Sequence, residues 1–149
     1  MVNSEAALEV PAPLGSVLPA VVAKVEQYFG SFVRLDCASA AGESFEVRVY
    51  LADWVFLAKG TTLADSSGAA GKNNAKLSAL MGQTLLQVVA RSTHELWLMF
   101  TGDMSLKLIA NLNEYDPDDE LLIAYLDVAF LMFSPTKGFV VAPPVRSEH

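Results

Sequence analysis

The sequence is poor in the side chains from which common catalytic and metal sites are built. Among its 149 residues there are one cysteine and two histidines. The single cysteine, Cys37, excludes an intramolecular disulfide and a zinc site built on several thiolates, and we interpret it as a small buried apolar residue. His94 falls in an expected hairpin turn and His149 in an expected tail, so neither is placed to act as the base of a triad with serine or cysteine.

Long apolar runs and clusters of positive charge are also missing. The longest apolar run covers residues 121–133 and is interrupted by Asp127, whereas a membrane-spanning helix needs roughly 20 apolar residues. Residues 1–9 contain no lysine or arginine, so the basic start of a secretory signal is absent and we expect a cytoplasmic protein. The ten basic residues are scattered and the net charge is −7, which argues against direct binding of nucleic acid.

Two short patterns resemble ligand sites but are incomplete. A phosphate-binding loop would need a glycine where Ser66 stands and a serine or threonine where Asn73 stands. Acidic residues alternate at positions 116, 118 and 120, but the glycine and the length of a calcium-binding loop are absent. Asp53 and Asp103 are interpreted as turn residues. We therefore assign no catalytic residue, metal or cofactor, although an unfamiliar enzyme that uses Asp, Tyr and Lys stays an open alternative.

The most regular feature of the sequence is an alternation of apolar and polar residues, which is typical of strands with one buried face. Residues 32–38 and 45–51 alternate in this way and are separated by a loop-forming segment. Further strands are expected at residues 54–58, 61–64, 84–91, 95–101, 105–112, 129–133 and 139–142.

Other segments have patterns that are typical of helices. In residues 16–29 apolar side chains recur at helical spacing, with a serine at the start and Gly30 at the C-terminal end. At Asp116 an aspartate, a proline and several acidic residues follow one another, which favours a helix near residues 117–127. A shorter helix is expected at residues 75–81, after a loop at 65–74 that is rich in Ser, Gly and Asn.

These elements predict one α+β domain: a mainly antiparallel sheet of about six to eight strands, packed by the N-terminal helix and by the helix near 117–127. We expect the domain to cover residues 16–142, between flexible tails at residues 1–15 and 143–149. An alignment of residues 47–54 with residues 97–104 raises the hypothesis of two similar meander halves. Shared turn chemistry produces the same match without any duplication.

The distribution of charge leads to a functional hypothesis. No basic residue lies between Lys107 and Lys137, whereas acidic residues are frequent there. We predict a patch that docks a basic protein partner, formed by Glu114, Asp116, Asp118, Asp119 and Glu120. On this reading the chain is a non-enzymatic binding module, such as an inhibitor or an immunity or antitoxin-type protein. Helix capping and solubility explain the same residues, and that alternative stays open.

The second hypothesis is a small apolar ligand-binding or chaperone-like protein. Its cavity would lie between the sheet and the helices and would be lined by Trp54, Trp97, Phe100 and Phe130. Aromatic residues at strand spacing are equally consistent with an ordinary core. A homodimer is also considered, with its interface at residues 121–133, because exposed sheet edges tend to pair.

Overall fold

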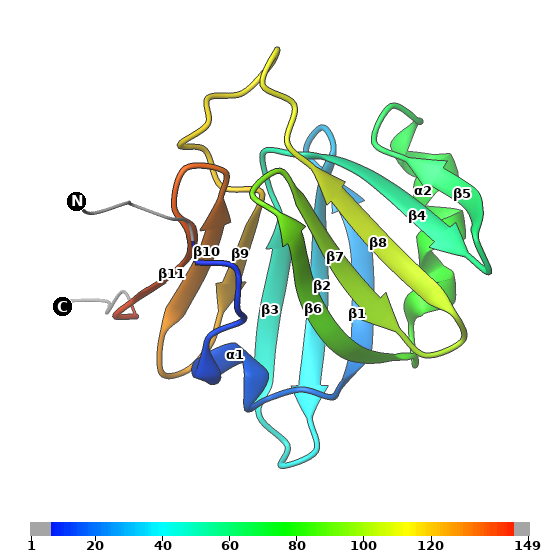
Figure 1. Cartoon of the computed structure of the whole chain (residues 1–149). Helices are drawn as coiled ribbons and strands as arrows, with labels where there is room; N and C mark the ends of the chain where they lie inside the picture. Colours follow the sequence, from blue (N-terminus) through cyan, green and yellow to red (C-terminus); the bar gives the residue numbers. More distant parts are fainter. Residues whose placement is uncertain (1–6, 145–149) are drawn as a thin grey trace, which may run out of the picture.

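The computed structural model describes residues 7–144, and all eleven strands in this part of the chain belong to one antiparallel sheet (Figure 1). The strands are β1 (Ala20–Tyr28), β2 (Phe32–Ser39), β3 (Ser44–Val49), β4 (Asp53–Ala58), β5 (Thr61–Asp65), β6 (Thr84–Ser92), β7 (Glu95–Phe100), β8 (Met104–Ile109), β9 (Leu122–Tyr125), β10 (Phe130–Ser134) and β11 (Gly138–Ala142). The helical elements are α1 (Ala12–Gly15), α2 (Ala70–Leu77) and the 3-10 turn η1 (Ser78–Leu80).

The order of the strands is nearly symmetric about the centre of the sheet. It reads β11-β10-β9-β3-β2-β1-β6-β7-β8-β4-β5. The segments β1–β2–β3 and β6–β7–β8 are two meanders whose first strands pair with each other. The strand that follows each meander pairs with the other meander, because β4 lies against β8 and β9 lies against β3. Two meander halves therefore exist. The alignment of residues 47–54 with 97–104 is wrong, since β7 and β8 are neighbours but β3 and β4 are not.

The short link between β3 and β4 requires this sheet to curl. Residues 50–52 join the two strands, and the four Cα–Cα steps involved reach at most about 15 Å. In a flat sheet the inter-strand spacings from β3 to β4, at about 4.8 Å each, would add up to roughly 29 Å. The sheet is accordingly bent, so that β6–β8 lie in front of β1–β3 and the link crosses at one end (Figure 1).

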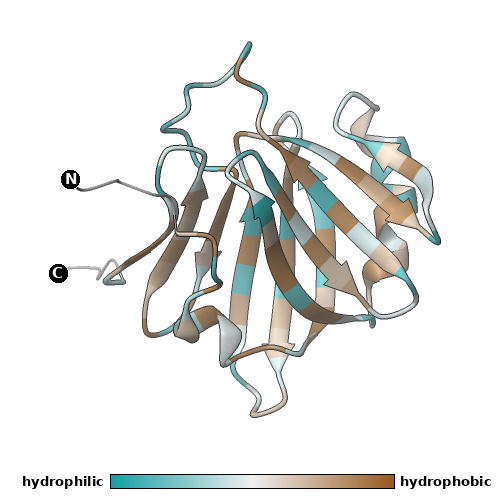
Figure 2. Cartoon of the chain, in the orientation of Figure 1, coloured by the Kyte–Doolittle hydropathy of each residue, from teal (hydrophilic) through white to brown (hydrophobic). Residues whose placement is uncertain are grey.

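The inward face of the curled sheet holds the core. In β7 the residues Leu96, Leu98 and Phe100 point inward, and in β4 Trp54 and Phe56 do the same. The alternation along the strands is visible as brown and paler bands in Figure 2. The sheet closes over most of its own apolar face, and Leu14 of α1, Leu77 of α2 and Leu80 of η1 complete the core.

Residues 16–29 do not form the helix that their apolar spacing predicts. Residues 20–28 are strand β1, which pairs with β2 along its whole length. A bulge between Val22 and Lys24 inserts one residue, so the inward side chains are Ala20, Val22, Val25 and Gln27. The bulge changes the spacing of the buried residues from two to three, and three is also a spacing of a helix face. The β-branched valines of this segment favour the strand.

Asp116 starts a tight turn, so the helix predicted near residues 117–127 is also wrong. The Asp119 N–H donates to the Asp116 carbonyl at 2.9 Å, and the Asp119 carboxylate accepts from the Asp116 N–H at 3.0 Å. Aspartate followed by proline suits the first positions of a β-turn as well as the N-terminus of a helix. The turn leads into β9, where buried and half-buried residues alternate from Leu122 to Tyr125.

The remaining helix is displaced from its expected position. It begins at Ala70, inside the loop predicted at residues 65–74, and continues through η1 to Leu80. The nine segments predicted as strands each contain a strand, and β1 and β9 bring the number in residues 7–144 to eleven. The prediction of a sheet of about six to eight strands is therefore too low. The fold is mainly antiparallel sheet, as the alternation predicts, but the predicted helices that would pack on it are strands or turns.

The N-terminal segment packs against the sheet where the structure describes it. Leu14 in α1 is fully buried, and Ala7 forms a parallel bridge with Gly138 at the start of β11. The tail predictions for residues 1–6 and 145–149 lie outside the described residues. No helix within residues 7–144 is both long enough and apolar enough to cross a membrane.

Candidate functional site

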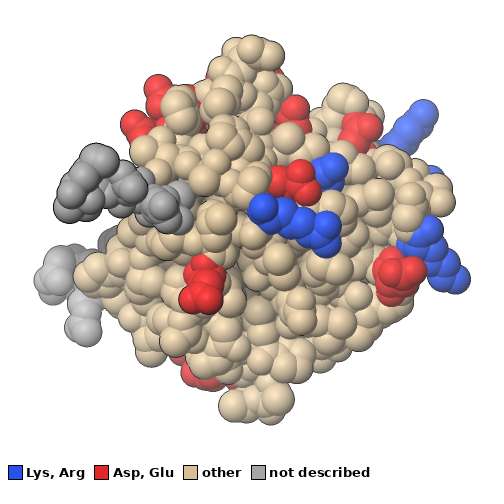
Figure 3. Space-filling model, viewed as in Figure 1, with Lys and Arg blue, Asp and Glu red and all other residues tan. Residues whose placement is uncertain are grey.

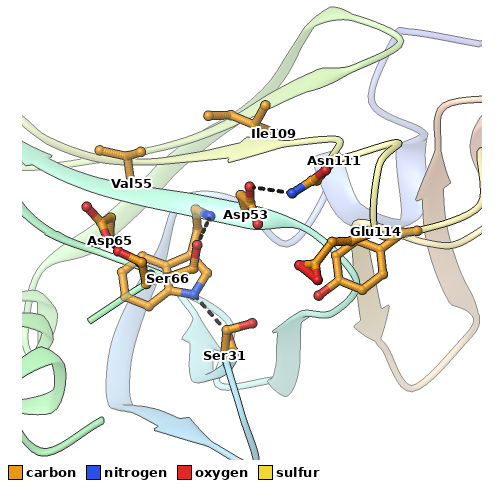
Figure 4. Close-up of a pocket in the computed structure, with 11 residues that line it drawn as sticks. Ser31, Asp53, Val55, Asp65, Ser66, Ile109, Asn111 and Glu114 are labelled. Carbon is orange, nitrogen blue, oxygen red and sulfur yellow. Dashed lines mark hydrogen bonds between the residues drawn. The ribbon is translucent and has the colours of Figure 1, made fainter. Parts of the chain in front are cut away.

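A polar hollow opens at the end of the sheet where several connections meet. It has a volume of about 460 Å³ and lies between the β1–β2 turn, the start of β4, the end of β5 and the segment 110–121 that joins β8 to β9 (Figure 4). Its polar lining includes Ser31, Asp53, Asp65, Asn111, Glu114 and Tyr115. No lysine, arginine or histidine belongs to this lining, so the charge of the hollow is negative.

The three carboxylates of the hollow come from distant parts of the chain. Asp53 accepts a hydrogen bond from the Asn111 side-chain amide at 3.0 Å, which ties the start of β4 to the residues after β8 (Figure 4). Asp65 accepts from the backbone N–H of Ser67 at 2.9 Å, and hydrogen bonds to the hydroxyl and the N–H of this serine hold the pKa of Asp65 below its usual value. Glu114 is exposed at the mouth.

Tyr115 contributes a neutral hydrogen-bonding group to the same lining. Partial burial raises the pKa of its phenol above the ordinary value, and the nearby negative charges of Glu114 and Asp53 raise it further. A hydrogen bond with Ser31 opposes this change. Tyr115 therefore keeps its proton at neutral pH and is able both to donate and to accept hydrogen bonds.

The wall of the hollow is held by hydrogen bonds and is partly apolar. The Trp54 indole is fully buried and donates from Nε1 to the Ser31 carbonyl at 2.7 Å. The backbone of Trp54 exchanges hydrogen bonds with Ser66, donating to its hydroxyl at 3.1 Å and accepting from its N–H at 2.9 Å. Val55 and Ile109 add aliphatic surface to the lining (Figure 4). A ligand in this hollow meets aliphatic groups and carboxylates together.

The predicted acidic patch is divided by the structure. All five of its residues lie in the segment 110–121, which projects at the top of Figures 1 and 3 and carries no basic side chain. Glu114 lies in the hollow with Asp53 and Asp65, whereas Asp118 and Glu120 line a second, smaller hollow beside β10 and β11. Residues 116 and 119 close the turn between these two sites through their carboxylates.

The four aromatic residues of the apolar-cavity hypothesis lie on two faces of the sheet. Trp54 and Phe100 point into the core, and they are 0% and 3% exposed. Trp97 lies on the outer face beneath the Arg91 guanidinium, which is 4.6 Å from the ring centroid. Phe130 packs edge-on against Tyr125 on the outer face, at 4.9 Å between ring centroids. The four residues therefore do not line one cavity.

The apolar run at residues 121–133 is mainly core. Leu121, Leu131 and Phe133 are almost completely buried, while Val128, in the turn between β9 and β10, is 69% exposed. Most apolar side chains of this run therefore pack inside the domain, and the homodimer with its interface in this run stays a prediction.

No protein-family model, curated protein or solved structure matches the chain. Within residues 7–144, no group of three or more histidine, cysteine, aspartate and glutamate side chains is arranged to hold a metal ion. The structure itself thus defines the class: a curled antiparallel sheet domain with an acidic, partly aliphatic hollow at one end.

The sequence alone did not reveal most residues of this hollow. Asp53 was interpreted as an ordinary turn residue, and Asp65, Asn111 and Tyr115 carry no motif. They meet because β4 pairs with β8 and β5 follows at the sheet edge, and this pairing has no local signal in the sequence. Only Glu114 belongs to the set predicted from charge.

Proposed function

We propose that the protein is a non-enzymatic binding module that docks a basic protein partner at this end of the sheet. The observation that carries the proposal is the convergence of Asp53, Asp65 and Glu114 on one open hollow that has no basic residue in its lining. The protein would cover part of the surface of this partner, as an inhibitor or an immunity-type protein covers its target.

The hollow suits the side chain of a lysine or an arginine. Such a side chain has an aliphatic stem and a cationic head, and it buries the stem on apolar surface while the head stays at polar groups. Val55 and Ile109 provide the apolar surface, and the carboxylates with Tyr115 provide hydrogen-bond acceptors for the head. The acidic segment 110–121 extends the negative field beyond the hollow and attracts a basic surface toward it.

Charge reversal at one end of the sheet tests this proposal. Glu114→Lys with Asp118→Lys changes two exposed carboxylates and leaves the hydrogen-bonded carboxylates of residues 116 and 119 in place. The matched control is Glu43→Lys with Asp127→Lys, which makes the same change in charge at two exposed residues of the opposite end. Each tagged protein is used to capture partners from native lysate, with quantitative mass spectrometry as the readout.

We expect one basic, near-stoichiometric partner that the wild type and the control capture and the Glu114→Lys/Asp118→Lys variant does not. Its affinity, measured with the purified partner, should fall as salt is raised, because the contact is electrostatic. An acidic partner, or capture that survives the reversal at residues 114 and 118, would show that the acidic end is only a solvated surface.

A further inference from the structure

The turn between β1 and β2 presents a large aromatic side chain in an unfavourable backbone conformation. Phe29 has a φ of 38° and is followed by Gly30 with a φ of 75°. Glycine adopts such angles without steric cost, whereas a bulky residue does so rarely. The Phe29 side chain is 83% exposed, more than any other large hydrophobic residue in the described chain. Strained residues that expose large apolar surface are typical of functional sites.

Buried polar groups hold this turn from the inside. The Gln27 side chain, in a residue that is 4% exposed, donates to the Gly30 carbonyl at 2.8 Å. The amide of Asn73 in α2, equally buried, donates in turn to Gln27 Oε1 at 2.7 Å. The Trp54 indole fixes the next carbonyl, that of Ser31. Hydrogen bonds from β1, α2 and β4 thus fix the turn before any partner arrives, which lowers the entropy cost of binding.

Phe29 stands on an aromatic platform. Its ring lies 5.9 Å from Phe32, whose ring packs against Tyr50 at 4.7 Å and against Tyr28 at 6.0 Å. Tyr50 follows β3, and its N–H donates to the Leu121 carbonyl at the end of the acidic segment. Aromatic residues dominate the energetically important centres of protein interfaces, because they bury large areas at a small loss of side-chain entropy.

Charged groups border this platform: the acidic segment 110–121 reaches it on one side through its backbone, and the Arg48 guanidinium lies 5.9 Å from the Tyr28 ring centroid. Ser31, two residues after Phe29, lines the hollow that holds Glu114, and the Glu120 carbonyl accepts from the N–H of Leu51. On another side α2 carries Lys72 and Lys76. An aromatic centre with a charged rim is the usual anatomy of a protein–protein interface, and the unequal charges of the rim would fix the orientation of the partner.

We propose that Phe29 is the apolar anchor of the docking surface, and that it inserts into an apolar pocket of a folded, basic protein whose positive residues face the segment 110–121. This inference rests on the proposed function and adds the centre of the interface to its acidic rim. It also explains why a phenylalanine occupies a position whose backbone favours glycine or asparagine.

Phe29→Asn separates binding from folding. Asparagine tolerates the left-handed conformation, so the variant should melt about 3 °C higher than the wild type. Lys59→Asn is the matched control, because Lys59 has a φ of 53° before Gly60 in the β4–β5 turn and is also exposed to solvent. A photoreactive benzophenone side chain, placed at position 29 or at position 59 in the cells that express the protein, identifies the partner by crosslinking.

We expect a basic protein to crosslink at position 29 and not at position 59. With that purified protein, Phe29→Asn should weaken binding by about 30-fold although the variant is more stable, and Lys59→Asn should bind as the wild type does. Equal binding by Phe29→Asn, no crosslinked protein at position 29, or a crosslink to a second copy of this chain would each overturn the inference.

The charge-reversal variant distinguishes the two proposals. Loss of binding in Glu114→Lys/Asp118→Lys together with full binding in Phe29→Asn removes the anchor and leaves the acidic docking surface. If binding is lost only in Phe29→Asn, the proposal that acidic residues dock the partner is refuted. The basic character assigned to the partner is then refuted with it.

Discussion

Replacing Asn73 by alanine should destabilise the protein strongly, although Asn73 lies in a short helix near a sheet edge. The Asn73 amide donates to Gln27 Oε1 at 2.7 Å and to the Asp65 carbonyl at 2.8 Å. The alanine variant leaves both acceptors without this donor. Each buried group that loses its partner costs about 1–3 kcal/mol, and the bond to the Asp65 carbonyl is only partly buried, so we expect a loss of about 2–4 kcal/mol in the free energy of unfolding.

Urea denaturation followed by circular dichroism measures this loss, and a thermal melt should show a Tm lower by roughly 10 °C. Lys76→Ala on the exposed side of the same helix is the control and should change stability by less than about 0.5 kcal/mol. The double variant Gln27→Ala/Asn73→Ala should lose less than the sum of the single changes, because the two side chains are partners. A loss below about 1 kcal/mol for Asn73→Ala would refute the reasoning that this network holds the β1–β2 turn.

Three further measurements follow from the placement of single side chains. Burial raises the pKa of the Cys37 thiol to about 12, so a thiol reagent at about pH 8 should label it only after unfolding in urea. The folded pKa of Cys37 exceeds the ordinary value of 9.0, so the stability that depends on a protonated thiol at this position is complete below pH 9 and is lost as the pH rises toward 12. The free energy of unfolding of Cys37→Ala should therefore fall less than that of the wild type between about pH 8 and about pH 11. Trp97→Phe should leave a blue-shifted emission from Trp54 that acrylamide quenches poorly, and a red-shifted, readily quenched spectrum would place Trp54 at the surface. Glu114→Gln should lower the pKa of Tyr115, measured by phenolate absorbance, because one of the negative charges that raise it is removed; an unchanged titration would separate the two side chains.

The strands were predictable from the sequence because the sheet buries one face. Where alternation is strict, as in β2 and β7, the predicted and observed strands differ by a residue at most. The prediction failed in β1, where the bulge after Val22 breaks the alternation, and at Asp116, where turn and helix start share the same residues. Both errors arise because local patterns are ambiguous at points where tertiary pairing decides.

The candidate site was predictable only in its charge. The absence of basic residues between Lys107 and Lys137 is visible in the sequence, and it draws attention to the segment that reaches the hollow. The contribution of Asp53 and Asp65 depends on the pairing of β4 with β8 and of β5 with β4. The sequence pattern places Phe29 on the apolar face of a helix, whereas the structure exposes it in a turn. The sequence alone therefore does not predict its exposure.

The exchange of strands between the two meanders explains why the candidate site lies where it does. Each meander sends its next strand to the other meander, so the link at residues 50–52 and the segment 110–121 both have to cross the same end of the curled sheet. The larger hollow lies where β4 begins and β5 ends, and the smaller one lies near the start of β9 and the end of β10. The crossing segments carry the acidic residues and Tyr50 to one end, beside the β1–β2 turn, and the fold thereby gathers aromatic and acidic groups from distant parts of the sequence into a single surface.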